Sequence, residues 1–375
     1  MKFGEIIGHQ EEKGKLVAMA EGKKLPHAIM LSGPSGVGKM QVARAFVQYL
    51  FCTDPKGGDS CGVCPNCLQT AKLNNPDIHY IYPVVKKNKA ELSADFFEEW
   101  KSFITKNPYM SPKKWLEELD AGNSRPSIYK AESEEVLRLS SLSSYGNGYK
   151  VFLVWLPEKM NIDASNRLLK VIEEPFSDTL FILVSNSPSE ILPTIRSRVQ
   201  NVEFKPLSGD EVVSILRRTG KYPEDEEVVK RIAQGDVNKA FAFMETGGEN
   251  SLFTEMFIRS MRGAYSRQMP ELKTLADTFA GYGREKSLRL LDYFARMVRE
   301  SFISNLRCAY LENMTAEERK FVDRFGPFIN ATNVEEISTH IDKAKEDISR
   351  NANQKIVWFD FLIELTRLIR TNLKK

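Results

Sequence analysis

The sequence predicts an α/β domain built on a parallel sheet and a phosphate-binding loop, followed by two helical segments. In the first half of the chain, short apolar runs alternate with amphipathic stretches, which is typical of a parallel sheet flanked by helices. A glycine-rich loop that ends in Lys39 follows the first apolar run. After residue 206, apolar residues recur with helical spacing almost to the end of the chain.

Three apolar runs are expected to form buried strands: Ala28–Leu31, Val151–Val154 and Leu180–Val184. The segment Lys39–Leu50 places its apolar residues on one helical face, and Ser165–Glu174 does the same. The order is therefore strand, helix, strand, helix, strand, which is the pattern of a parallel sheet.

At 375 residues the chain exceeds the usual size of a single core, so two or three domains are expected. We expect a phosphate-loop domain at 1–206, a small helical lid at 207–247 and a helical C-terminal domain at 248–375. Residues 85–127 interrupt the first domain with lysines, several aromatic residues and scattered prolines, and are interpreted as an inserted subdomain of open role. The clearest long helices of the second half are expected at Leu272–Ala280, Leu288–Phe302 and Ile356–Leu373.

Composition limits the class of protein. A hydrophobic content of 42% is ordinary for a globular protein. Without an apolar run long enough to span a bilayer or an apolar secretion signal, we expect a cytoplasmic protein with no membrane partner. The net charge of +3, from 53 basic and 50 acidic residues, gives no general attraction to nucleic acid. Any contact with DNA should be local or made by an assembly.

The glycine-rich loop carries the strongest motif. Gly33, Gly36 and Gly38 allow backbone N–H groups to point inward at the opening of a helix, and Lys39 can reach outer phosphates. Met40 stands where a Ser or Thr hydroxyl would ligate magnesium, and a thioether cannot bind that hard cation. We expect a degenerate loop that binds ATP or ADP weakly or not at all, with magnesium disfavoured. The rival interpretation is a glycine-rich turn that only caps a helix.

The strand at 151–154 lacks the acidic pair that usually follows such a strand, one to hold magnesium and one to polarise the attacking water. The two expected positions hold Trp155 and Leu156. Glu158 comes two residues later and could substitute, although a solvated residue or a first-turn carboxylate is the simpler interpretation. Together with Met40, these departures predict that the chain does not hydrolyse ATP at an appreciable rate.

Four of the five cysteines are clustered, at Cys52, Cys61, Cys64 and Cys67, whereas Cys308 stands alone. Four thiolates close a tetrahedral structural zinc site and leave no open position for catalysis. An iron–sulfur cluster or a pair of disulfides are the alternatives. The compact spacing in a cytosolic chain favours a structural zinc module over about 52–67.

Two polar side chains follow the strand at 180–184. Asn186, at the end of this strand, is in a position to contact a γ-phosphate. Without a catalytic metal in the site, we do not expect it to have this role. Arg198 follows a short helix at the edge of the domain, from where its planar guanidinium could reach a nucleotide on an adjacent subunit. A surface ion pair is the alternative for any single arginine.

These motifs together carry a family resemblance. The phosphate loop, the four-cysteine insert, the run Asn166–Pro175 and the run Thr194–Arg198 resemble bacterial clamp-loader subunits of the AAA+ class, over about residues 1 to 245. Motor chains of the gamma or tau type keep the metal-binding acids, whereas delta-prime chains of DNA polymerase III often have a decayed ATPase site. Met40, Trp155 and Leu156 fit the delta-prime pattern.

The resemblance implies a hetero-oligomeric loader with gamma/tau-like and delta-like subunits, acting on a sliding clamp and, as an assembly, on primed DNA. Arg198 would be an arginine finger acting in trans on a neighbouring ATPase, and the helices of 248–375 would join a collar. Val199 replaces the cysteine of the family motif, and Asn238 stands near the position of a second sensor arginine. The chain would be a component of the DNA-directed DNA polymerase holoenzyme with no catalysis of its own.

Two other functions stay open at this point. The chain could be an ATP-hydrolysing AAA+ motor that uses Glu158 in an unusual register. It could also be a zinc-dependent DNA-binding regulator, against which the nearly neutral charge counts.

Overall fold

Five parallel strands form a sheet with the order β2-β3-β4-β1-β5. The strands are β1 Ala28–Ser32, β2 Ile78–Ile81, β3 Lys150–Trp155, β4 Thr179–Ser185 and β5 Gln200–Glu203. The three predicted strands are confirmed, and every residue of β1, β3 and β4 is buried. This sheet confirms the predicted α/β class.

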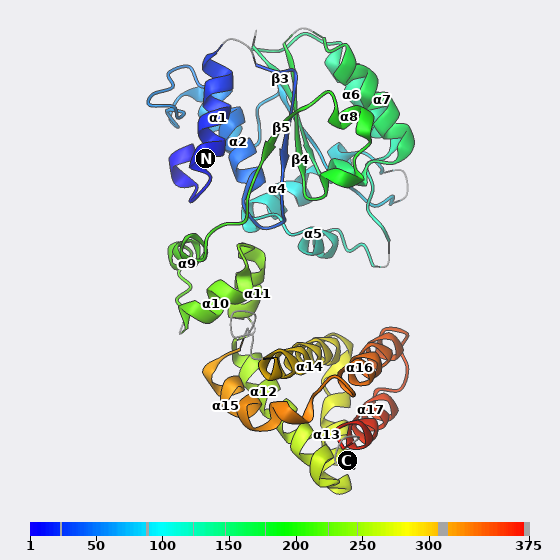
Figure 1. Ribbon diagram of the computed structural model, residues 1–375. Coiled ribbons are helices and arrows are strands. Elements are labelled where there is room, and N and C mark those ends of the chain that lie inside the picture. Colours follow the sequence, from blue (N-terminus) through cyan, green and yellow to red (C-terminus); the bar gives the residue numbers. More distant parts are fainter. Residues whose placement is uncertain are drawn as a thin grey trace. The chain divides into compact units, whose positions relative to one another are not determined.

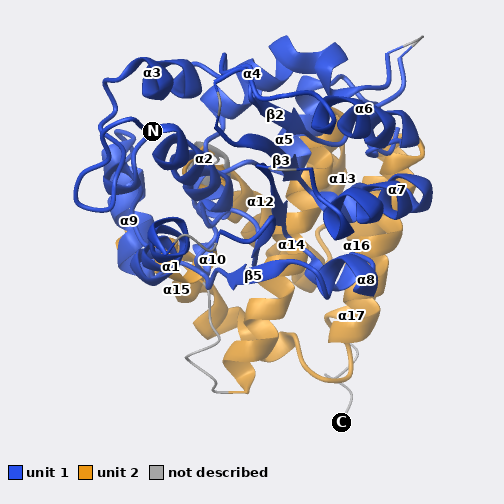
Figure 2. Ribbon diagram, turned by 90° about the horizontal axis from the view of Figure 1, so that it is seen from above, with its two compact units in different colours: residues 1–223, 233–241 blue, residues 224–232, 242–375 orange. Residues whose placement is uncertain are grey.

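The computed structural model describes a defined part of the chain and divides it into two compact units (Figure 2). The units comprise residues 1–223 with 233–241, and residues 224–232 with 242–375. The three-part division at 206 and 247 stays a prediction, and Cys308 lies outside the described residues. The described residues are 1–22, 25–87, 90–122, 124–146, 148–176, 178–223, 225–245, 247–306 and 314–370.

Helices cover both faces of the sheet. Figure 1 shows α1 and α2 on one face and α6 and α7 on the other. The predicted helices at 39–50 and 165–174 are confirmed as α2 and α7. Asn161 caps α7 by accepting the N–H of Ala164 at 2.8 Å, as Asn does at many helix starts. The first unit contains α1 Gln10–Glu21, α2 Lys39–Phe51, α3 Pro65–Ala71, α4 Phe97–Lys106, α5 Pro112–Glu118, α6 Lys130–Ser140, α7 Ile162–Glu173, α8 Pro193–Arg196 and α9 Gly209–Arg218.

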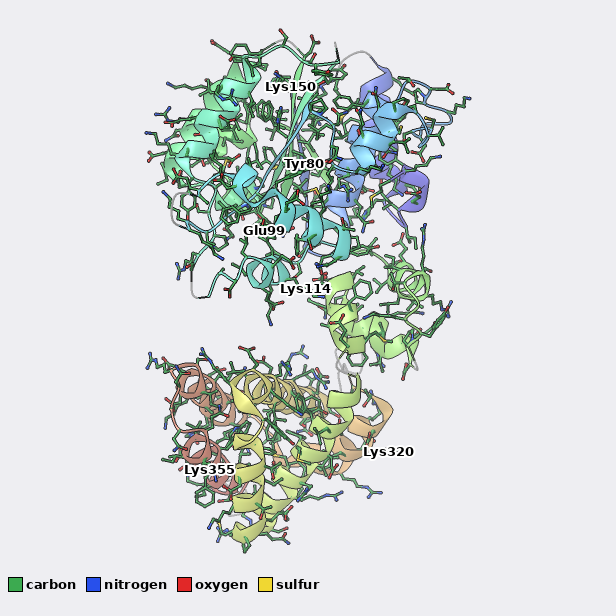
Figure 3. The ribbon with its side chains drawn as sticks, turned by 180° about the vertical axis from the view of Figure 1, so that it is seen from behind. Tyr80, Glu99, Lys114, Lys150, Lys320 and Lys355 are labelled. Atoms are coloured by element: carbon green, nitrogen blue, oxygen red, sulfur yellow. The ribbon has the colours of Figure 1, made fainter. Side chains whose placement is uncertain are left out.

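The segment 85–127 contributes α4 and α5, which lie by one end of the sheet. Figure 3, seen from behind, shows Glu99 of α4 and Lys114 of α5 far from Lys150, the first residue of β3. The inserted helices are therefore at the end of the sheet where the strands finish and where parallel α/β folds place their ligands.

Ser208 caps α9, the first helix after residue 206. Its capping box is reciprocal: the Ser208 hydroxyl accepts the N–H of Glu211, whose carboxylate accepts the N–H of Ser208 at 2.7 Å. Two further helices follow, α10 Glu226–Ala233 and α11 Val237–Glu245.

The described elements of the second unit that follow residue 246 are all helical and bury their own core, in which Phe279, Phe294 and Trp358 are fully buried. The helices predicted at 272–280 and 288–302 are confirmed within α13 and α14, and the one predicted at 356–373 is confirmed as α17 up to Leu368. The elements are α12 Gly247–Ser266, α13 Met269–Ala280, α14 Gly283–Asn305, α15 Ala316–Phe325, α16 Val334–Ser349 and α17 Gln354–Leu368.

Candidate functional site

The glycine-rich loop connects β1 to α2 at the end of the sheet where the strands finish. Gly33, Gly36 and Gly38 have φ values of 141°, 74° and 92°, a region that favours glycine. At Gly33 a Cβ atom would also come within 2.3 Å of the carbonyl oxygen of Phe204. The loop conformation therefore depends on these glycines.

Lys39, at the start of α2, is only 4% exposed. Its ammonium donates hydrogen bonds to the carbonyl oxygens of Gly33 (2.7 Å) and Pro34 and to Oδ1 of Asn186 (2.9 Å). Burial lowers the pKa of Lys39 to about 7, although the carboxylates of Glu158 and Asp236 act in the opposite direction. Because a lysine ammonium has three N–H donors, groups of the same chain occupy all of them.

Very little space is left beside the loop. The cavity there has a volume of about 10 Å³, which is close to the minimum for one water molecule. Pockets for small organic ligands usually enclose several hundred Å³ or more. A cavity of this size, among the residues that the structure describes, is too small for a nucleotide. The lining residues are Gly36, Val37, Gly38, Lys39, Met40, Tyr109, Met110, Trp155, Val184 and Asn186.

The strand that should supply magnesium ligands ends in apolar side chains. Trp155 is 1% exposed and Leu156 is 5% exposed. The ring of Trp155 packs against Trp100 and Phe103 of the inserted helix α4, with centroid distances of 5.5 and 5.9 Å. Met40, which also lines the cavity, is 2% exposed.

Glu158 lies on a first turn, as expected, but the interpretation that it is solvated is wrong. Its Oε1 accepts the backbone N–H groups of Asn186 (2.9 Å) and Ser187 (3.2 Å), while its Oε2 is buried and has no partner among the residues described. Glu158 therefore fixes the backbone at the end of β4 and supplies negative charge near Lys39.

The four clustered cysteines come together as a metal-binding geometry. The Sγ atoms of Cys52, Cys61, Cys64 and Cys67 all lie within 4.8 Å of one another, and those of Cys61 and Cys67 are 3.9 Å apart. Four sulfurs around one zinc ion at about 2.3 Å would be roughly 3.8 Å apart. The residues therefore fit a single ion, and more closely than a cluster of several irons.

Backbone donors support the sulfurs. The N–H of Cys61 donates to Sγ of Cys52 at 3.2 Å, that of Cys64 to Sγ of Cys61 at 3.4 Å, and that of Cys67 to Sγ of Cys64 at 3.5 Å. Burial raises the pKa of Cys64, but N–H donors from Thr53 and Cys67 outweigh it and bring the pKa to about 6. Burial raises the pKa of Cys67 to about 12, and a bound cation would be needed to make it a thiolate.

The cysteine module is tied to the N-terminus and to α2. Asp59 accepts the N–H groups of Phe3 (3.0 Å) and Gly4 (2.9 Å), and the amide of Asn66 donates to the carbonyl oxygen of Phe51 at 2.9 Å. The module therefore braces the start of the chain against the end of the phosphate-loop helix.

Arg198 lies apart from its own phosphate loop, after α8. Its guanidinium pairs with Glu173 of α7 at 2.8 Å and donates to the carbonyl oxygen of Thr194 at 3.0 Å. The side chain is 41% exposed. The guanidinium is thus oriented by its own chain but stays open to a second molecule.

Comparison with known proteins places these features in a family. The sequence profile described as "DNA polymerase III, delta subunit" matches residues 8–208, more than half of the chain. The chain belongs to the DNA polymerase III delta subunit family. In this delta-family chain the matched segment contains the phosphate loop, the four cysteines, the 85–127 segment and Arg198.

Two relatives that are named as delta′ subunits agree with this assignment. The chain is 30% identical over 174 residues to DNA polymerase III subunit delta′ of Pseudomonas aeruginosa, a match that covers 46% of this chain and 41% of that protein. It is 24% identical to subunit delta′ of Escherichia coli over 80% of this chain and 77% of the relative. A solved structure of a gamma-subunit-related protein from Thermotoga maritima is 14% identical, with a TM-score of 0.38 and coverage of 96% and 100%.

Within this family, three groups that contact the loop or Arg198 were not expected from the sequence. Tyr109 lies against Gly38, and a Cβ atom added there would meet its ring at 3.4 Å. Oδ1 of Asp236 would lie 1.7 Å from a Cβ atom at Gly36. Glu173 pairs with Arg198. Each is distant in sequence from the group that it contacts, and the aromatic content of 85–127 was the only signal for any of them.

In the part of the delta-family chain that the structure covers, no helix combines the length and the apolar character needed to cross a membrane.

Proposed function

We propose that this chain is a non-hydrolysing, delta-prime-type subunit of the DNA polymerase III clamp loader, which helps to load the sliding clamp onto primed DNA. The observation that carries the proposal is the apolar character of the metal-facing positions: Met40, Trp155 and Leu156 are all at most 5% exposed. Magnesium needs oxygen ligands. Without them, a bound ATP would lack the cation that neutralises the developing charge during phosphoryl transfer.

The role proposed for Arg198 is to complete the ATPase site of a neighbouring gamma/tau-like subunit. Its position after α8, its exposure of 41% and its fixed orientation on Glu173 support this role. An exposed ion pair contributes little, about 0–1 kcal/mol, so exchanging Glu173 for a phosphate of the neighbour costs little. A guanidinium placed at transferring phosphates accelerates hydrolysis strongly.

A structural zinc ion is proposed for Cys52, Cys61, Cys64 and Cys67. The sulfur spacing and the N–H donors support this assignment. The ion would cross-link the four cysteines and stabilise the fold. It would not catalyse a reaction, because four thiolates fill its coordination sphere. The proposed partners are gamma/tau-like and delta-like subunits, the clamp and, through the assembly, primed DNA. The proposed lid is 207–247, and the proposed collar is 248–375.

The decisive test is ATP turnover by the complex reconstituted from this chain, its loader partners, the clamp and primed DNA. Arg198→Ala should leave assembly intact and reduce turnover at the adjoining site by about 1,000-fold or more, the range known for arginine fingers. Arg196→Ala is the matched control, because Arg196 is an exposed arginine two residues away. Unchanged turnover in Arg198→Ala would remove the arginine from the mechanism.

One observation favours a second candidate, an active ATPase. The buried Oε2 of Glu158 is unpartnered within the described part of the chain and lies in the neighbourhood of Lys39. A carboxylate oxygen is a suitable magnesium ligand. Magnesium-dependent phosphate release by the isolated chain, abolished in Glu158→Gln, would favour this candidate over the non-hydrolysing subunit.

A further inference from the structure

The turn between α4 and α5 reaches the phosphate loop. Residues 107–111 connect the two inserted helices, and Tyr109 and Met110 line the 10 Å³ cavity beside the loop. Tyr109 is 9% exposed and Met110 is 4% exposed. Two side chains of the insertion therefore fill space that a phosphate-binding loop normally leaves for its ligand.

Tyr109 is held in this place by contacts on several sides. Its ring lies against Gly38 and 6.3 Å from the ring of Phe241. Its hydroxyl is hydrogen-bonded to Gln41, in the first turn of α2, and burial raises the pKa of the hydroxyl to about 12. The amide of Asn238 donates to the carbonyl oxygen of Tyr109 at 3.2 Å. The turn is thus bonded to both the phosphate-loop helix and residue 238.

A later segment of the chain, Asp236 to Asn238, also contacts the loop. The N–H of Val237 donates to the carbonyl oxygen of Gly36 at 3.1 Å, and the carboxylate of Asp236 lies close to Gly36. A carboxylate at this place repels phosphate instead of binding it. The three donors of Lys39 are used within the chain as well.

The inserted helix α4 packs on the end of strand β3 through aromatic side chains. Trp100 and Phe103 pack on Trp155, and Nε1 of Trp115 donates to the carbonyl oxygen of Pro83 at 2.7 Å. The aromatic contacts therefore attach the helix that precedes the turn to the end of the sheet.

We propose that the 107–111 turn is a built-in occupant of the nucleotide site, which keeps this chain in a closed, nucleotide-free state. Tyr109 and Met110 take the space, and Asp236 to Asn238 hold the turn against the loop. The proposal concerns nucleotide binding by this chain and is independent of what Arg198 does for a neighbour. Either can fail alone.

The test is equilibrium binding of a fluorescent ADP analogue to the full chain. The wild-type chain should bind weakly, and Tyr109→Ala should bind about 10- to 100-fold more tightly, because removing the ring raises the fraction of open molecules. The gain should not need magnesium, and adding Lys39→Met should remove it. Tyr145→Ala, which deletes a ring that is 86% exposed, is the matched control and should bind like the wild type.

Two results would overturn the proposal: tight binding by the wild-type chain, or a folded Tyr109→Ala chain that gains no affinity. Circular dichroism and the melting temperature report whether the variant is folded. If the variant is not folded, the test is hydrogen exchange of the backbone amides at 33–40 in the wild-type chain, compared with and without excess ADP. Unchanged exchange supports the closed site, and slowed exchange refutes it.

Discussion

Replacing Trp100 with alanine should destabilise the first unit by about 3–4 kcal/mol. Trp100 is fully buried; its ring stacks on Tyr82 at 3.9 Å and 9° and meets Trp155 at 5.5 Å. Truncating a buried tryptophan costs about 3–5 kcal/mol, and each good aromatic pair can contribute about 0.5–1.5 kcal/mol. Against this, Nε1 of Trp100 is buried without an acceptor among the described residues, so truncation removes a donor whose burial already costs about 1–3 kcal/mol.

A second variant, Trp100→Phe, separates the loss of ring packing from the removal of the unpaired N–H, which Trp100→Ala combines. Trp100→Phe keeps a ring against Tyr82 and deletes the unsatisfied N–H, so we expect a loss of about 1 kcal/mol or less. The free energy of unfolding should be measured with urea and far-ultraviolet circular dichroism, since removing a tryptophan alters the fluorescence signal. Because the chain has two compact units, two transitions are expected and should be fitted separately.

Trp358 provides the matched control, because it is fully buried in the core of the second unit. Trp358→Ala should shift the other transition by a similar amount and leave the one affected by Trp100→Ala in place. A loss below about 1 kcal/mol in Trp100→Ala, or equal losses for alanine and phenylalanine, would refute the reasoning that ring packing at this cluster holds the insertion.

Two further predictions concern charge and metal. Elemental analysis of the reduced chain should find about one zinc ion per chain. Cys64→Ser should release the ion and lower the melting temperature. Finding iron, or no metal, would contradict the zinc assignment. Burial lowers the pKa of Lys39 from 10.5 to about 7, so the unfolded chain binds more protons between these values and stability rises with pH there, by up to about 1.4 kcal/mol per unit. The unfolding free energy of the wild type minus that of Lys39→Met should therefore grow by about 2 kcal/mol from roughly pH 7 to pH 9; a flat or falling difference would be inconsistent with a buried lysine of lowered pKa.

The sequence predicted the strands whose burial is complete and missed those whose burial is partial. β1, β3 and β4 are apolar runs with every residue buried. In contrast, three of the four residues of β5 are exposed, so no apolar pattern marks this edge strand. β2 is an edge strand of four residues that includes His79, and it is too short for a periodic signal.

The same distinction holds at the site. The glycines of the loop and the four cysteines are local patterns, and their spacing alone indicates what they can bind. Tyr109 and Asp236 contact the loop from far along the chain, and only the folded backbone brings them there. A single sequence gives aromatic content for 85–127 but not the surface on which those aromatic residues pack.

Trp155 bears on both the missing magnesium ligand and the packing of the inserted helices. Where a metal-binding acid would stand, its indole removes an oxygen ligand and, at the same time, offers a flat apolar surface at the end of β3. An aspartate there would carry a hydration shell that the rings of Trp100 and Phe103 could not displace without a large desolvation cost. The inserted helices can therefore pack on this strand only after the acid is gone, and once they are packed a carboxylate cannot return without an unpaired buried charge. The absence of a magnesium site and the closed nucleotide site that we propose would in this way be two consequences of one side chain.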